Sequence, residues 1–344
     1  MKQSIRHLRI GLFLFLASFA NQGMAQSAPQ QLKGSGWQAS TNAAPAVAVF
    51  GNYECVAWKS ATSNEILFTC SVQFSDNWPA PQVVGGSGWT AKTTEAPTLA
   101  GDEISGEVWL SWKGAGGNKI WYSTSMGSTW TKQQTVSGSG WTAESTAAPA
   151  LGGGDGITLA WKGASSDDIW YTVWNYPGWS TQRTASGSGW TAGTSTTPAW
   201  TQYDEGIIPA LFWKGGSPDV WMSYAYDWTS QQKVSCNNPS WTAETSAAPA
   251  AAYIPNPDGG DTFTTVFWKG NSSNSIWYSY QTPGASCGWA QQATVSGSGW
   301  TADTNAAPAV ANGAYPYYTR ILAWKNATDN TIWYLDPTTL PGPW

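Results

Sequence analysis

The sequence contains six copies of one pattern, and this repeat constrains the fold more than any other feature. Each copy opens on a tryptophan, with a proline eight residues later, and the openings lie 52, 52, 49, 51 and 59 residues apart. A period near fifty residues is typical of repeat architectures in which each copy forms one unit of supersecondary structure. The opening pairs are Trp37/Pro45, Trp89/Pro97, Trp141/Pro149, Trp190/Pro198, Trp241/Pro249 and Trp300/Pro308.

The second copy shows what one repeat is expected to form. Apolar or β-branched runs at 96–100, 107–112, 119–124 and 130–136 are separated by Gly, Asn, Asp and Ser. Four short strands bounded by turn residues, repeated along the chain, predict the blades of a propeller. The last copy lacks a fourth strand, and the segment around Leu32 matches the missing one. The prediction is an all-β, six-bladed β-propeller of four-stranded antiparallel blades, closed by the N-terminal strand, which removes two open sheet edges.

Residues 1–25 are predicted to be a signal peptide. They combine a basic start, an apolar stretch at about 10–20 and a small-x-small sequence at 23–25. Residues 26–344 are then expected to form a single propeller domain that is secreted or periplasmic, and no membrane insertion is expected.

Removal of that segment changes the chemistry available to the chain. The single histidine, His7, is lost, and the remaining arginines are Arg183 and Arg320. The remaining chain has 13 basic and 21 acidic residues, which gives a formal net charge of −8. An acidic surface disfavours nucleic acid as a partner. Without histidine, Ser-His-Asp and Cys-His catalysis and histidine metal sites are excluded, and neither a metal nor a cofactor is expected.

The four cysteines lie in the exported part, where disulfides are permitted. Cys55 precedes Trp58 by three residues and Cys70 follows Leu67 by three, so a hairpin that opposes Trp58 and Leu67 would bring the cysteines together. Cys236 and Cys287 both lie in segments with local insertions. This shared irregularity favours a Cys236–Cys287 disulfide, with two free thiols as the alternative.

The connecting segments repeat better than the strands do. The fourth-to-first and second-to-third connections emerge on the same face of a four-stranded blade, so one face should present six similar sets of Trp, Lys and Asn or Asp. Two interpretations compete: a structural clasp, in which tryptophans hold neighbouring blades together, and a set of sugar-binding sites. The candidate ligand-binding residues are Trp37, Lys59, Asn64, Trp89, Lys113, Asn118, Trp141, Lys162, Asp167, Trp190, Lys214, Asp219, Trp241, Lys269, Asn274, Trp300, Lys325 and Asn330.

These repeats give the chain a resemblance to the tandem-repeat β-propeller lectins. It is also distantly similar to the sialidase-type Asp-box propellers, because residues 123–130 have the spacing S-x-D-x-G-x-x-W, with Ser125 in place of the aspartate. The resemblance implies the propeller fold and carbohydrate binding. The six-bladed fucose-binding lectins use an arginine and a glutamate in each site. This chain has no arginine in each blade, so fucose specificity is not implied.

The functional prediction is a secreted, multivalent carbohydrate-binding protein (a lectin) without catalytic activity, whose partners are glycans or glycoconjugates. Its alternatives are a protein-interaction or structural propeller and, third, a glycoside hydrolase that uses paired carboxylates. Glu144, Glu244 and Asp303 occupy one repeated position and are carboxylate candidates. The acid pairs Asp102-Glu103, Asp167-Asp168 and Asp204-Glu205 are interpreted as turn residues. No oligomeric state is predicted.

Overall fold

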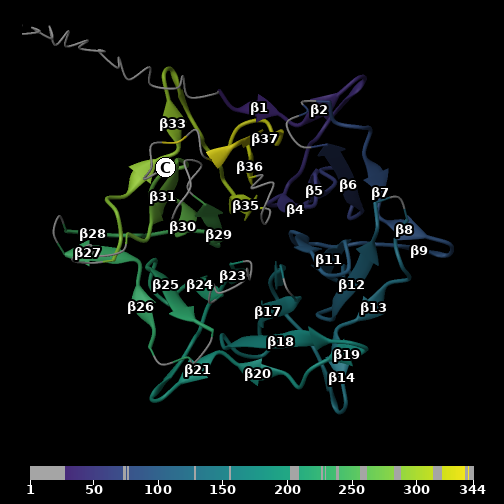
Figure 1. Cartoon of the computed structure of the whole chain (residues 1–344), viewed down its shortest axis with the longest axis horizontal. Coiled ribbons are helices and arrows are strands. Elements are labelled where there is room, and N and C mark those ends of the chain that lie inside the picture. Colours follow the sequence, from purple (N-terminus) through teal and green to yellow (C-terminus); the bar gives the residue numbers. More distant parts are fainter. Residues whose placement is uncertain are drawn as a thin grey trace, which may run out of the picture.

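Six antiparallel sheets surround a central axis and form a closed ring (Figure 1). The computed structural model describes residues 28–340 except 73–74, 76, 128, 155, 202–208, 226–227, 229, 238–239, 256–261, 283–287, 313–319 and 338–339. Within these residues every element is a strand, and no helix is long and apolar enough to cross a membrane. The predicted all-β, six-bladed propeller is therefore confirmed. The predicted signal peptide lies outside the described residues.

Blades 1–5 run in chain order from the axis outward, blade 3 has one additional short strand, and the outermost strand of blade 6 is β1. The first three are blade 1, β4 (Ala46–Phe50), β5 (Tyr53–Lys59), β6 (Ile66–Val72) and β7 (Gln82–Val83); blade 2, β10 (Thr98–Asp102), β11 (Glu107–Lys113), β12 (Ile120–Ser125) and β13 (Gln134–Thr135); and blade 3, β16 (Ala150–Gly152), β17 (Thr158–Lys162), β18 (Ile169–Asn175) and β20 (Arg183–Thr184), with β19 (Gly178–Trp179) paired to the end of β18. The others are blade 4, β23 (Ala199–Trp200), β24 (Ala210–Lys214), β25 (Val220–Tyr224) and β26 (Gln232–Lys233); blade 5, β29 (Ala250–Pro255), β30 (Thr262–Lys269), β31 (Ile276–Tyr280) and β32 (Ala293–Thr294); and blade 6, β35 (Ala309–Asn312), β36 (Arg320–Lys325), β37 (Ile332–Leu335) and β1 (Gln30–Gln31).

The N-terminal strand completes the last blade, as predicted. Strand β1 pairs antiparallel with β37, with Gln30 opposite Tyr334, and the Tyr334 hydroxyl donates a 3.1 Å hydrogen bond to Gln30 Oε1. Leu32, directly after β1, is 0 % exposed. Closure thus joins the two ends of the described chain, and β1 becomes the outermost strand of blade 6.

The hydrophobic core is divided among the six junctions between neighbouring blades. At each junction the tryptophan of a Trp-Lys pair packs against an aliphatic residue and a larger side chain from the third strand of the preceding blade. At the first junction, for example, Trp112 of blade 2 packs in one cluster with Ile66 and Phe68 of blade 1. The same arrangement recurs at the other five junctions. The six tryptophans, Trp58, Trp112, Trp161, Trp213, Trp268 and Trp324, are 1–2 % exposed.

The repeated Gly-Ser-Gly-Trp segments form short hairpins rather than loops. These hairpins project at the outer rim of the ring between successive blades (Figure 1). The glycine before each opening tryptophan has a positive φ where the motif is intact, as at Gly140 (φ 79°), which only glycine adopts readily. The hairpins are β2 (Lys33–Gly34) with β3 (Trp37–Gln38), β8 (Gly85–Gly86) with β9 (Trp89–Thr90), β14 (Ser137–Gly138) with β15 (Trp141–Thr142), β21 (Ser186–Gly187) with β22 (Trp190–Thr191), β27 (Ser235–Asn237) with β28 (Ser240–Thr242), and β33 (Ser296–Gly297) with β34 (Trp300–Thr301).

The fourth strands are shorter than expected. In blade 2 the predicted strand at 130–136 reduces to β13, and Trp130 pairs with Ser125 in an isolated bridge. The ring of Trp130 meets Phe68 of blade 1 edge-on, with ring centroids 4.9 Å apart.

One of the two predicted disulfides is confirmed. Cys55 and Cys70 are opposed in the β5–β6 register and form a disulfide. Cys236 is also disulfide-bonded, but its predicted partner, Cys287, lies outside the described residues.

Closure by the N-terminal segment gives a direct stability prediction. Leu32→Ala should lower the free energy of unfolding by about 2–5 kcal/mol, because it leaves a cavity in the core between blades 6 and 1. The neighbouring exposed residue provides the control, and Lys33→Ala should change stability by less than about 0.5 kcal/mol. Chemical denaturation of both variants measures the difference. Equal stabilities would contradict closure by this segment.

Candidate functional site

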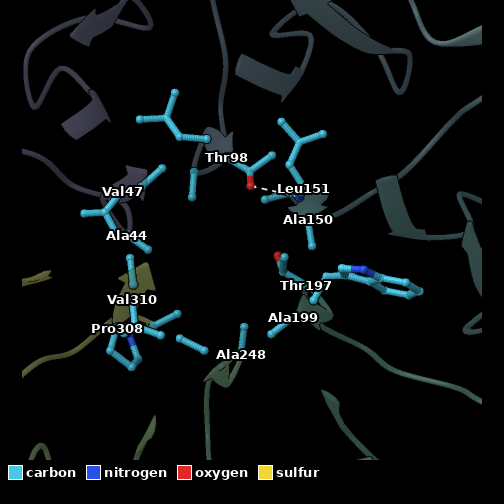
Figure 2. Close-up of a pocket in the computed structure, with 18 of the residues that line it drawn as sticks. Ala44, Val47, Thr98, Ala150, Leu151, Thr197, Ala199, Ala248, Pro308 and Val310 are labelled. Atoms are coloured by element: carbon cyan, nitrogen blue, oxygen red, sulfur yellow. Dashed lines mark hydrogen bonds between the residues drawn. The ribbon is translucent and has the colours of Figure 1, made fainter. Parts of the chain in front are cut away.

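An apolar pocket lies at the axis of the ring. Six equivalent Ala-Pro or Thr-Pro segments line its mouth, a cavity of about 130 Å³ (Figure 2). Thr98 Oγ1 accepts a 3.0 Å hydrogen bond from the Leu151 backbone amide at its wall. An adjoining cavity that shares Leu151 and Trp200 with this lining has a volume of about 30 Å³. The described lining residues include no acid, base or amide side chain, so this pocket cannot supply acid–base chemistry.

The six repeated lysines are largely internal. All except the half-buried Lys214 are at most 9 % exposed. Their ammonium groups donate to a polar side chain five residues after the opening tryptophan: Lys59 to Asn42 (2.8 Å), Lys113 to Thr94 (3.1 Å), Lys162 to Thr146 (3.2 Å), Lys269 to Ser246 (2.8 Å) and Lys325 to Asn305 (2.5 Å). Burial lowers the pKa of Lys269, and also that of Lys325, where Asp329 opposes the shift. These contacts tie five of the six blades to the segment that follows the preceding hairpin, whereas Lys214 of blade 4 donates to the Gly215 carbonyl.

The opening tryptophans lie against the same turns. Five are half-buried, and Trp241 is buried. Trp37, Trp141 and Trp190 stack on the tryptophan of the following Trp-Lys pair, with ring centroids 6.3–6.4 Å apart. In the intact hairpins the ring also covers the glycine opposite it, as Trp89 covers Gly86, where a Cβ atom would approach Nε1 to 2.7 Å. Glycine is required at these positions because the tryptophan ring approaches the backbone closely.

The Asn or Asp positions divide into two groups. Asn64, Asn118, Asp167, Asn274 and Asn330 are exposed, and their backbone carbonyls accept hydrogen bonds from the amides of the adjacent hairpin segments. Asp167 also forms a 3.3 Å ion pair with Lys162. Asp219 differs, because the blade 4 turn is one residue shorter. Asp219 therefore lies one position later in the repeat, at the position that Lys119 has in blade 2 and Asp168 has in blade 3. Ligand binding by these residues stays a prediction.

The residue at the position of Lys119 forms an isolated β-bridge in every blade, and this bridge links the blade to the segment that follows the next hairpin. The bridged residues carry opposite charges at two junctions, as in Glu65–Lys92 and Lys119–Glu144. At the junction between blades 4 and 5 the bridge instead opposes two carboxylates, Asp219 and Glu244. Like charges placed directly opposite each other destabilise a strand pair. This bridge therefore departs from the repeat in a way that costs stability.

The hydrogen bonds around this bridge define how closely the two carboxylates approach. The Val220 amide donates to Ala243 O (2.9 Å), and the Thr245 amide donates to Pro218 O (2.8 Å). Asp219 and Glu244 are therefore a non-hydrogen-bonded antiparallel pair, the type in which opposed side chains lie closest. Glu244 is exposed, and the Asp219 side chain is 14 % exposed.

Basic and hydroxyl groups hold Asp219 as a carboxylate. Lys233 Nζ lies 2.7 Å from Asp219 Oδ2, and the Ser217 hydroxyl donates a 2.8 Å hydrogen bond to the same oxygen. Burial acts to raise the pKa of Asp219, but the hydrogen bonds from Lys233 and Ser217 and the charge of Lys233 outweigh it, so the pKa lies below its ordinary value. Lys233 also lies over the Trp221 ring, 5.3 Å from its centroid.

Two further departures occur at the same junction. Lys233 stands opposite Trp221, in the position where blades 2, 3 and 5 carry threonine. In the longer hairpin of the fifth copy Cys236 stands opposite Trp241, where the intact hairpins have glycine. The Cys236 side chain excludes the ring position seen at Gly86, and Trp241 is only 7 % exposed. We therefore define the candidate site as Asp219, Glu244, Lys233 and Ser217.

Two of these four residues were predicted from the sequence. Glu244 was a carboxylate candidate, Asp219 was assigned to the Asn or Asp position of the other copies, and Lys233 was not singled out. The short blade 4 turn was the missed signal, since Trp221 follows Trp213 by eight residues and the other copies use nine.

The other acid pairs are structural where the structure describes them. Asp102 is 8 % exposed, and its carboxylate caps its own turn through the Ile104 and Ser105 amides and the Ser105 hydroxyl. Asp168 accepts a hydrogen bond from Ser166. The pair 204–205 lies outside the described residues. No group of three or more His, Cys, Asp or Glu side chains suited to a metal occurs among the residues described.

Comparison with known proteins shows the fold and does not show a family. No protein-family model matches the sequence, and no curated protein sequence matches it. Solved structures do match. The GH93 α-L-arabinofuranosidase of Fusarium graminearum, in complex with arabinobiose, is 12 % identical, with 84 % of this chain and 90 % of that chain covered and a TM-score of 0.58. The α-L-arabinanase of Penicillium chrysogenum, also in complex with arabinobiose, is 12 % identical and has a TM-score of 0.60, and the match covers 86 % of this chain and 94 % of that chain. A mutant of the NanB sialidase from Streptococcus pneumoniae is 9 % identical and has a TM-score of 0.57, and the match covers 94 % of this chain and 70 % of that chain.

These neighbours correct two predictions. The chain was expected to be a lectin without catalytic activity and not an enzyme, whereas these three matching structures are glycoside hydrolases. The expectation treated absent histidine and scarce arginine as evidence against catalysis, although a pair of carboxylates needs neither. The broader expectation of a carbohydrate partner is consistent with neighbours that hold arabinobiose.

The lowered pKa of Asp219 makes its stabilising effect depend on pH. The ionised carboxylate is favoured in the folded protein, so its contribution is present above the unfolded value near pH 4 and is lost as the pH falls through the lower folded value. Wild type should therefore melt at a higher temperature than Asp219→Asn at neutral pH, and the margin should shrink below about pH 4. When Lys233→Met is added to both proteins, the difference in melting temperature at neutral pH should be smaller. A difference in melting temperature that does not depend on pH would contradict the assignment.

Proposed function

We propose that the protein is a glycoside hydrolase whose catalytic carboxylates are Asp219 and Glu244. The single observation that carries this proposal is their direct opposition in the bridge between blade 4 and the following hairpin. Glycosidases flank the scissile bond with two carboxyl groups, one as acid or base and one as nucleophile or base. The exposed Glu244 side chain leaves the pair open to a substrate at this rim.

The environment of each carboxylate assigns its role. Asp219 stays ionised because Lys233 and Ser217 hold it, which suits a nucleophile at the anomeric carbon. The acid/base role then falls to Glu244, which would protonate the leaving oxygen and later deprotonate water. Opposed side chains in such a bridge have Cβ atoms about 4.5–5.5 Å apart. We therefore assign the retaining mechanism, because side chains that start from Cβ atoms this close can bring their carboxyl groups to the separation of about 5–5.5 Å that it requires.

The arginines limit the substrate to a neutral sugar. An anionic sugar such as a sialic acid calls for a cluster of cationic side chains around its carboxylate. Arg183 lies on blade 3, and Arg320 lies on blade 6, where it is 6 % exposed. The arabinofuranosidase and arabinanase neighbours support a neutral furanoside. We further propose that the enzyme acts outside the cytoplasm, which the Cys55–Cys70 disulfide supports.

Aryl glycosides test the proposal directly. Wild type should release nitrophenol from one or more neutral glycosides, with p-nitrophenyl α-L-arabinofuranoside as the first substrate and an aryl sialoside as the negative comparison. Asp219→Asn and Glu244→Gln should each lower kcat/KM by about 10²–10⁴-fold, the usual contribution of a positioned acid–base group. Glu144→Gln is the matched control, because Glu144 occupies the same bridge position opposite Lys119. Equal rates in all three variants, or no hydrolysis across a broad panel by wild type, would refute the proposal.

The stereochemistry of the product is a separate prediction. If the carboxyl groups are as close as the bridge implies, the first-formed sugar should have the same anomeric configuration as the substrate. Proton NMR of the early reaction mixture distinguishes the two anomers. An inverted first product would require a second carboxylate farther from Asp219 and would rule out the retaining assignment.

A further inference from the structure

Large apolar side chains are exposed on the face of the ring opposite the Trp-Lys turns. The first-to-second and third-to-fourth connections of the blades form this face. In the described part of the chain six large apolar side chains are exposed, and all six belong to blades 1–3. Exposed apolar side chains that gather on one face indicate an interaction site. Five of the six lie in or beside the connections of this face: Tyr53 (45 %), Val72 (54 %), Ile104 (75 %), Met126 (75 %) and Tyr176 (91 %).

The exposed residues of blades 1 and 2 surround a cavity of about 320 Å³. Tyr53 and Met126 line it from the two sides of the junction, and Val72 stands opposite Tyr53 in the β5–β6 register. Pro79 and Ala80, which are also exposed, line it too. The mouth of the cavity is therefore apolar as well as open. Its volume lies at the lower end of the range typical of ligand sites, which is enough for one large side chain.

Aromatic rings form the walls of this cavity. Phe50 and Tyr53 stack with ring centroids 5.6 Å apart, and Trp130 meets Phe68 edge-on at 4.9 Å. The Thr69 hydroxyl, which also belongs to the lining, already donates a 2.8 Å hydrogen bond to a backbone carbonyl. A polar group that entered between these rings would lose hydrogen bonds to water, which is costly. The cavity therefore suits an apolar side chain.

The connections around the cavity are acidic. Four segments of blades 1 and 2 reach this face, 50–54, 71–81, 102–107 and 125–130, and together they contain five acidic residues and no lysine or arginine. Glu103, beside Ile104 at the tip of its turn, is exposed. Charges of opposite sign on a partner would speed association and orient it. The surface thus favours a partner that is both apolar and basic.

That requirement separates the candidate occupants of this face. In a two-fold dimer a second copy of the chain would place the same patch against itself, so acidic connections would meet acidic connections. An anionic membrane would repel the acidic connections, and a lipid surface has no protruding side chain to fill the cavity. A protein segment that carries one large apolar side chain beside lysine or arginine matches both the cavity and the charge.

We infer that this face of blades 1 and 2 docks a basic segment of a partner protein. One large apolar side chain of that segment enters the cavity, and its lysines or arginines face the acidic connections. The carboxylate pair lies at the Trp-Lys turns of blade 4, on the opposite face of the ring. The inference therefore stands whether or not the protein is a hydrolase.

Methionine NMR of the full chain tests the docking with three peptides. The basic apolar peptide acetyl-Lys-Lys-Phe-Leu-Lys-Lys-amide should shift the 13C-methyl signal of Met126 on titration. It should not shift that of Met222, which is 0 % exposed in blade 4. A peptide with glutamate in place of lysine, and one with alanine in place of phenylalanine and leucine, should leave both signals unchanged at the same concentrations. No shift with the basic apolar peptide, or an equal shift with either control peptide, would overturn the inference. A Met126 shift with phosphatidylcholine vesicles and none with the peptide would assign the face to a membrane instead.

Two tyrosine variants locate the contact. Tyr53→Ser should weaken binding of the basic apolar peptide by about tenfold, the effect of truncating an aromatic residue at the centre of an interface. Tyr176→Ser is the matched control and should not change the affinity, because Tyr176 is more exposed on the same face but belongs to blade 3. An unchanged Met222 signal shows that each variant is folded. Binding to wild type should weaken as the salt concentration rises, because salt screens exposed charges. Equal affinities for the two variants, or binding that does not depend on salt, would contradict the assignment.

Discussion

The burial of one tryptophan from each blade against the blade before it is the interaction on which the ring depends. The tryptophan of each Trp-Lys pair is at most 2 % exposed and occupies one of the six junction clusters. A buried tryptophan removes about 150–250 Å² from water, which at about 25 cal/mol per Å² contributes on the order of 4–6 kcal/mol before entropy is counted. In five of the six blades the adjacent lysine bonds a side chain in the segment that precedes its blade, so both residues of a Trp-Lys pair stabilise the junction with the preceding blade.

A ring held by six equivalent contacts makes departures informative. Most repeated residues already satisfy a structural need, because the lysines bond polar side chains and the opening tryptophans cover glycines. Functional chemistry therefore has to be sought where one copy differs from the others. Junction 4/5 opposes two carboxylates where junctions 1/2 and 2/3 oppose residues of opposite charge. This arrangement costs stability at its own position, which a merely structural repeat would not favour.

The fold could be predicted from the sequence because its signals are periodic. The Trp-Lys spacing predicted the register that brings Cys55 opposite Cys70, and the position of Leu32 predicted closure. The site could be predicted only in part. Aligning the copies by residue count placed Asp219 with Asn118, whereas a turn shorter by one residue shifts it to face Glu244. In the fifth copy a longer hairpin likewise brings Cys236 opposite Trp241, where the intact hairpins have glycine. Changes in turn length alter which side chains meet, and composition does not reveal them.

Trapping of a covalent intermediate tests the central claim most directly. A retaining glycosidase treated with an activated 2-deoxy-2-fluoro glycoside of its substrate accumulates the sugar as an ester on the nucleophile, since the fluorine slows the second step. Intact-mass spectrometry followed by peptide mapping locates the ester. The account predicts one sugar per chain, attached to Asp219, with labelling abolished by Asp219→Asn and preserved in Glu144→Gln. A label on any other carboxylate, or an unlabelled chain with a glycoside that the protein hydrolyses, would contradict it.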